Sequence, residues 1–278
     1  MLIGFGMPSL TTTVGGTGAA AVTSTDALVD GSPGSVTRFT WASGAQTTST
    51  TVTLTQVFTA QTVVRCLCLL GTTLPVGLKV EVKGKRAIDV GYTYDLGGNS
   101  LTQHIVEFPD GSRGAWWVFN EGLDAVTGIR VTLYNDVGGA TSLSASDEFD
   151  IGELAPFQGI DVCIRRTLQD TIVDPSRLRR SPNNQPNKLF RRPYRVLRMD
   201  FAPRASVTDL RTLRYDLATT VSCAVIPIYL VAGTTTLDTD VLHETAMYGT
   251  MTDPISIVAV SDGRYWEGSM AFEEYPPA

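Results

Sequence analysis

Residues 129–135, with the sequence IRVTLYN, decide the fold class of this chain. The aliphatic residues Ile129, Val131 and Leu133 alternate with Arg130, Thr132 and Tyr134. Successive side chains of a strand point to opposite faces, so this period of two predicts a strand with one buried and one exposed face. Residues 78–83, LKVEVK, repeat the pattern.

Similar short segments recur along the chain, and Gly, Asn, Asp and Pro separate them. Residues 63–70 are apolar on both faces except at Arg65, which predicts a central strand buried on both sides. Many short strands with turn residues between them predict a sandwich or barrel, and the absence of strand–helix alternation argues against a parallel α/β fold. The other expected strands are 37–41, 51–55, 88–94, 104–108, 115–119, 149–151, 160–165, 195–201, 223–231, 255–260 and 265–272.

The length of 278 residues favours two domains in a mainly β protein. We expect an extended N-terminal arm at 1–30, a first β-sandwich at 31–157 and a second β-rich, sandwich- or barrel-like domain at 158–278. One short helix is predicted in the second domain, at 207–218. Ser206 is suited to cap its start, and Leu210, Leu213 and Leu217 recur at helical spacing.

Composition limits the function classes. With 43% apolar and 18% charged residues the chain is expected to fold rather than remain disordered. No segment approaches the roughly 18 apolar residues of a membrane span. The N-terminus has no basic residue before Arg38, unlike a secretory signal. We therefore expect synthesis in the cytoplasm and no membrane span.

Charge is distributed unevenly. Residues 161–216 hold 13 of the 22 basic and only 6 of the 28 acidic residues. The segment 174–193 combines arginines with prolines and cannot bury much surface, so we expect a long exposed basic loop. A subunit interface, a solvated loop and a nucleic-acid contact are the alternatives; nucleic acid ranks lower because aromatic residues for base stacking are few. The expected subunit-interface residues are Arg177, Arg179, Arg180, Arg191, Arg192 and Tyr194.

Recognisable catalytic chemistry is sparse, and no catalytic residue, metal site or cofactor is predicted. His104 and His243 are the only histidines, and neither stands in a nucleophile or zinc motif. The carboxylates at 147–153 are interpreted as a solvated strand face, because Glu148 and Asp150 alternate with apolar residues. The glycines at 97–98 indicate a hairpin turn rather than a phosphate loop.

Trp116 and Trp117 are adjacent on an expected strand, so one indole faces inward and the other outward. The outward indole has three interpretations. It stacks on a sugar ring, it packs against a neighbouring subunit, or strand ends and loops of the same chain cover it. Both residues are therefore candidate glycan contacts.

Two resemblances to known families add to these patterns. Residues 27–31 (ALVDG) and 37–41 (TRFTW) resemble the opening of discoidin-like, galactose-binding-like sandwiches, and 129–135 with 148–154 are similar to their closing strands. This resemblance spans residues 25–160 and implies a sandwich. Arg180, Ser181 and Gln185, the segment RRPYR at 191–195 and GSMAFEE at 268–274 look like tail-tip proteins of tailed phages, whose domains form rings below the tail tube. The order of domains differs from the commonest distal tail proteins, because here the sandwich comes first.

The tail-protein resemblance implies a virion structural protein of a long-tailed, siphovirus-like phage. Such a distal or minor tail protein would be assembled in the host cytoplasm and would contact itself and other tail proteins. A carbohydrate-binding module that attaches to a host surface glycan is the alternative. An enzyme such as a glycosidase is the third hypothesis, and it lacks an identifiable acid/base pair.

The four cysteines should all be buried thiols. Cys66 and Cys68 point the same way on one strand, too close for an unstrained bridge, and Cys163 and Cys223 stand alone in apolar stretches. Mass spectrometry of the denatured, non-reduced protein should find four free thiols. A Cys163–Cys223 bridge or stoichiometric zinc would contradict this prediction.

Overall fold

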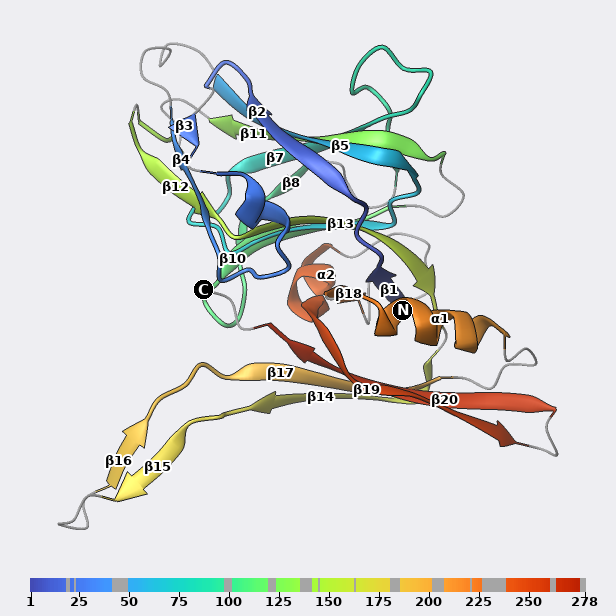
Figure 1. Ribbon diagram of the computed structural model, residues 1–278. Coiled ribbons are helices and arrows are strands. Elements are labelled where there is room, and N and C mark those ends of the chain that lie inside the picture. Colours follow the sequence, from blue (N-terminus) through green and yellow to red (C-terminus); the bar gives the residue numbers. More distant parts are fainter. Residues whose placement is uncertain are drawn as a thin grey trace.

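The protein is mainly β, and the paired strands are antiparallel (Figure 1). The computed structural model describes residues 1–18, 21–22, 24–41, 50–97, 102–119, 124–135, 142–144, 146–162, 164–180, 186–201, 208–220, 222–226, 239–260 and 264–275.

Within these described residues the strands form four sheets. The largest runs in the order β14 (Ile164–Val173), β17 (Tyr194–Phe201), β20 (Tyr265–Glu274), β19 (Met247–Val260), β18 (Cys223–Ile226), β1 (Leu2–Phe5), β13 (Glu153–Asp161), β6 (Cys66–Leu70), β10 (Arg113–Val118) and β9 (Val106–Glu107). A second has β2 (Leu10–Gly15), β5 (Thr50–Thr62), β11 (Val126–Asn135), β7 (Lys79–Lys85) and β8 (Thr102–His104). A third has β12 (Glu148–Ile151), β4 (Thr37–Thr40) and β3 (Ala21–Val22), and β15 (Arg177–Arg180) pairs with β16 (Pro186–Leu189).

The strand predicted from IRVTLYN is the centre of the sandwich. It lies within β11, between β5 and β7, and Val131 is opposite Leu54 on one side and Val82 on the other. Ile129, Val131 and Leu133 are fully buried in the core between the two sandwich sheets. The alternation therefore identified the correct buried face.

Strand β6 is buried on both faces, as its sequence predicted. Leu67 and Leu69 enter the sandwich core. Cys66, Cys68 and Leu70 join a different core on the opposite face. That second core is completed by β18 and α2 (Thr239–Thr245), which belong to the C-terminal unit, defined here as residues 162–275.

The expected N-terminal arm is instead part of the sheet. Strand β1 lies between β13 and β18, with Leu2 opposite both Asp161 and Ile226. Leu2 and Ile3 are fully buried, and β2 pairs with β5 of the sandwich. The chain's own strands order this segment, because they supply its backbone hydrogen bonds without a partner molecule.

The expected boundary at residue 157 falls inside strand β13. Residues 153–157 of this strand pair with β6 of the sandwich, and residues 158–161 pair with β1. One strand therefore connects the sandwich to the C-terminal unit without a linker.

Helix α1 (Thr208–Ala218) agrees with the predicted helix, and Leu217 is buried in the core of the C-terminal unit. The side chains of Leu210 and Leu213 lie outside the described residues. Helix α2 and the short 3-10 helix η1 (Asp26–Val29) were not predicted, because seven and four residues are too few to show a helical period. Within the described part of the chain, no helix has the length and apolarity needed to cross a membrane.

Two other segments differ from expectation. The predicted strand at 88–94 is a loop, and the predicted basic loop at 174–193 contains the β15–β16 hairpin. Arg177 pairs with Leu189 and Arg180 with Pro186, while residues 181–185 lie outside the described part. The four-residue hairpin strands are mostly polar, so they carry no alternation that sequence reasoning could detect.

The described cysteines agree with prediction. Cys66, Cys68 and Cys223 are buried free thiols, and Cys163 lies outside the described residues. Burial raises the pKa of Cys66 and of Cys223 to about 12, so both remain protonated at neutral pH.

Gly4 of β1 should be sensitive to substitution. A Cβ atom there would lie 2.6 Å from Cys66 Sγ and 3.0 Å from the Cβ of Phe157. Gly4→Ala should lower the free energy of unfolding by roughly 1–3 kcal/mol, because overpacking forces buried strands apart. Gly91→Ala is the matched control, since a Cβ at Gly91 meets nothing within 4 Å. Equal urea midpoints for the two variants would contradict the central position of β1.

Candidate functional site

A cleft of about 730 Å³ lies between the sandwich and the C-terminal unit. The sandwich contributes the turn at 108–112 and Trp116 of β10. The C-terminal unit contributes β14, the segment 192–195, helix α2 and residues 274–275. Aromatic side chains from both halves line it, namely Phe108, Trp116, Tyr194, Tyr248 and Tyr275. An aromatic cleft of this size is suited to a small ligand or a few side chains of a partner.

Arg195 organises one wall of the cleft. Its guanidinium donates to both carboxylate oxygens of Asp170, with the shorter contact at 2.6 Å, and to the carbonyl oxygens of Thr245 and Ala246. These bonds satisfy backbone acceptors at the end of α2. The backbone N–H of Arg195 also donates to Glu274 at 3.0 Å. One residue therefore links β14, β17, β20 and α2.

His243 connects the two halves at the back of the cleft. Its Nε2 accepts a hydrogen bond from the backbone N–H of Trp116 at 3.1 Å, and the ring also bonds the backbone of Thr239. Burial lowers the pKa of His243, and the Thr239 bond and the charge of Asp240 oppose that shift. A neutral imidazole with these two bonds acts as a structural tie between α2 and β10.

Neither candidate glycan contact is on the surface. Trp117 is fully buried in the sandwich core, and Trp116, at 2% exposure, lies in the core between the sandwich and the C-terminal unit. The outward indole is therefore covered by the same chain. Sequence reasoning could not detect this cover, because it comes from residues more than 100 positions away.

The structure separates the six predicted interface residues. Arg192 and Tyr194 line the cleft, and Arg192 reaches across to Asp110 at 3.8 Å. Arg177 and Arg191 are exposed on or beside the hairpin. The side chains of Arg179 and Arg180 lie outside the described residues.

The β15–β16 hairpin projects from the ends of β14 and β17, away from the rest of the molecule (Figure 1). Lys188 pairs with Asp174 at 2.8 Å, and Ser176 exchanges hydrogen bonds with the backbone of Arg191. The Lys188 ion pair, with help from Ser176, holds the pKa of Asp174 well below its ordinary value. Leu189 is 51% and Phe190 78% exposed, so the base of the hairpin presents apolar surface to solvent.

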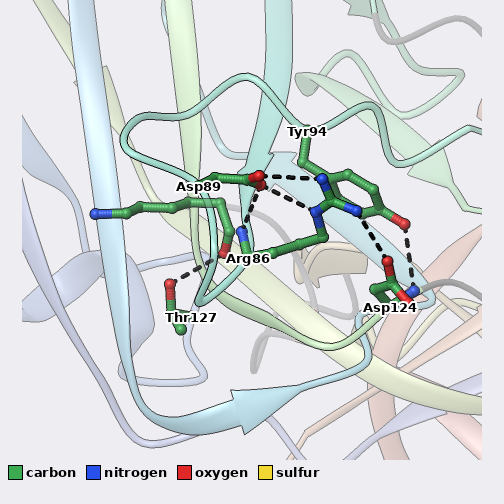
Figure 2. Close-up of polar contacts among 6 residues, drawn as sticks. Arg86, Asp89, Tyr94, Asp124 and Thr127 are labelled. Carbon is green, nitrogen blue, oxygen red and sulfur yellow. Dashed lines mark hydrogen bonds and ion pairs between the residues drawn. The ribbon is translucent and has the colours of Figure 1, made fainter.

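A second exposed apolar feature is the loop 86–94 of the sandwich. Figure 2 shows Arg86 bonded to Asp89 and Asp124, and its guanidinium lies 4.4 Å from the ring centroid of Tyr94. This network holds the loop while Ile88 and Val90 are 81% and 101% exposed. The hydrogen bonds between Arg86 and Asp89 close a turn in the backbone. Residues 88–94 therefore do not form a strand, although their sequence alternates.

Glu153, behind the cleft, is a buried carboxyl group. The expectation of a solvated strand face for the carboxylates at 147–153 is wrong at Glu153, because its side chain is fully buried. Glu153 lies two residues after Ile151 and four after Phe149, so the strand alternation places it on their buried face. This alternation could have predicted its burial from the sequence. Burial, and next the charge of Asp30, raises the pKa of Glu153 to about 8. The Tyr248 hydroxyl and the amides of Gly31 and Ser32 face it, yet neither oxygen has a partner at good hydrogen-bond geometry among the described residues.

Comparisons with known proteins found little. No family model and no curated protein matches the chain. One solved structure, titled CpGH89CBM32-6 produced by Clostridium perfringens, aligns with 13% identity over 53% of this chain and 94% of that chain, with a TM-score of 0.28.

Glu153 predicts how stability depends on pH. Between the ordinary carboxyl pKa of 4.5 and about 8, the folded state keeps the proton and the unfolded state loses it, so stability falls as pH rises through this window. Glu153→Gln should stabilise the protein, and the gain should grow from near zero at about pH 5 to a few kcal/mol above about pH 8.

Thermal melts across this pH range test the prediction. Glu148→Gln, on the exposed face of β12, is the control and should leave the profile unchanged. A stability gain for Glu153→Gln that does not vary with pH would contradict the buried, protonated carboxyl group.

Proposed function

We propose that this chain is a non-enzymatic structural protein of the tail tip of a long-tailed bacteriophage, where it self-associates into a ring or connector. The observation that carries self-association is the projecting β15–β16 hairpin with exposed apolar residues at its base.

A two-stranded hairpin by itself is marginally stable in water. This hairpin is absent from the buried cores formed by the described residues, and Leu189 and Phe190 remain exposed beside Lys188. Burying such side chains against a neighbour contributes about 25 cal/mol per Å² of apolar area. A neighbouring copy is a suitable partner, because the chain outside residues 161–216 carries 22 acidic and 9 basic residues.

The assignment to a phage tail comes from the resemblance of residues 180–195 and 268–274 to tail-tip proteins. It gives the location as the virion, with assembly in the host cytoplasm, and other tail proteins as further partners. Nucleic acid ranks lower as a partner, because the basic segment has few aromatic residues for base stacking.

Carbohydrate binding is the second candidate, and the cleft favours it. Phe108, Tyr194 and Tyr275 line the cleft together with carboxylates, and aromatic rings beside polar groups are suited to stack on a sugar and bond its hydroxyls. Glycan-array binding by the intact protein that Tyr194→Ala abolishes would support attachment to a host glycan instead of a purely structural role.

Self-association should depend on the apolar base of the hairpin. The variant Leu189→Ser/Phe190→Ser should keep the wild-type melting temperature, because both side chains are exposed, but should remain a single chain where the wild type assembles. Light scattering during gel filtration and electron microscopy of the particles measure this.

Ile88→Ser/Val90→Ser is the matched control, because it removes equally exposed apolar side chains from the loop 86–94. It should assemble normally. A wild-type protein that stays monomeric at high concentration, or a hairpin variant that assembles like the wild type, would overturn the proposal.

A further inference from the structure

We infer that the cleft of one copy receives the β15–β16 hairpin of a second copy, so that copies join head to tail. This inference rests on the proposed self-association and adds the surface that receives the hairpin.

Charge complementarity is the first argument. The cleft is lined by four carboxyl groups (Asp110, Asp170, Glu244, Glu274) against two guanidinium groups (Arg192, Arg195), and His243 is neutral. Residues 177–189 carry three arginines, one lysine and no acidic residue. Opposite net charges steer two surfaces together and suppress wrong pairings.

Glu244 is the carboxylate most available to a partner. It is exposed on α2 and has no hydrogen-bond or ionic partner among the described residues. Asp110 and Asp170 already contact Arg192 and Arg195. An incoming arginine could therefore pair with Glu244. It could also bond to Asp110 and Asp170, because their oxygens have lone pairs left to accept further hydrogen bonds.

Apolar surfaces also match. The cleft presents the partly buried rings of Phe108 and Tyr275, and the hairpin base presents the exposed Leu189 and Phe190. Aromatic pairs contribute beyond their buried area, and aromatic and arginine anchors dominate the energy of many interfaces. The volume of about 730 Å³ has room for several side chains of a hairpin, not for a whole domain.

A copy cannot fill its own cleft. The segment Arg192–Arg195 that leads out of the hairpin is itself a wall of that cleft. The Lys188–Asp174 ion pair and the Ser176–Arg191 bonds hold the hairpin base, and the hairpin points away from the sandwich in Figure 1. The donor is therefore another copy.

We place the hairpin of each copy in the cleft of the next copy rather than in a reciprocal exchange between two copies, so the contact is heterologous. Such contacts produce a closed ring when the rotation between copies closes, as the proposed ring or connector requires. An isologous hairpin-to-hairpin contact would instead stop at a dimer.

The test uses two variants of the full chain. Glu244→Arg reverses the charge of the cleft and keeps the hairpin, and Leu189→Ser/Phe190→Ser alters the hairpin and keeps the cleft. Glu244→Arg should raise the concentration needed for assembly at least tenfold and melt like the wild type. Asp26→Arg, an equal reversal on an exposed residue outside the cleft, is the control and should assemble normally.

Adding Arg177→Glu to Glu244→Arg restores opposite charges across the contact and should recover part of the assembly. Normal assembly by Glu244→Arg, while the hairpin variant stays monomeric, would overturn the cleft as receptor and leave self-association standing. Normal assembly by the hairpin variant would overturn both. A loss of assembly in Glu244→Arg that Arg177→Glu does not relieve would also count against the cleft.

Discussion

Strand β13 joins the two halves of the molecule into one continuous sheet. Its first half pairs with β6 in the sandwich and its second half with β1, which in turn pairs with β18 of the C-terminal unit. Backbone hydrogen bonds therefore continue from one half of the molecule to the other. Any rotation between the halves would break a buried ladder and leave its polar groups unpaired.

The continuous sheet creates a second buried layer. Strands β6 and β10 have the sandwich core on one face. The C-terminal unit covers their other face, where Trp116 and Cys68 share a core with Ala224 and Leu242. The cleft opens at the rim of this layer. Its walls are held by the hydrogen bond from Trp116 to His243 and by Arg195, so a partner would meet a preformed surface with little ordering cost.

Ion pairs also hold the loop 86–94 and the base of the β15–β16 hairpin. Arg86 fixes the loop 86–94 through two carboxylates and the Tyr94 ring, and Lys188 with Ser176 fixes the base of the hairpin (Figures 1 and 2). The loop and the hairpin both present apolar side chains to solvent, and they differ in their local charge. The hairpin carries the local positive charge of the chain, whereas Arg86 in the loop is already neutralised by Asp89 and Asp124. This difference makes the hairpin the better electrostatic partner for an acidic surface.

Local sequence patterns predict the β class, the buried face of β11, the double burial of β6, helix α1 and the buried thiols of Cys66, Cys68 and Cys223, and the structure has all of them. Each of these follows from a local period or a local run, which fixes whether a side chain faces apolar surroundings. Which segments meet is visible only in the folded chain. The pairing of Leu2 with Asp161, the cover over Trp116, the burial of Glu153 and the meeting of Asp110 with Arg192 all join residues distant in the chain. Strand pairing depends on such distant neighbours rather than on local propensity, and no local pattern records them.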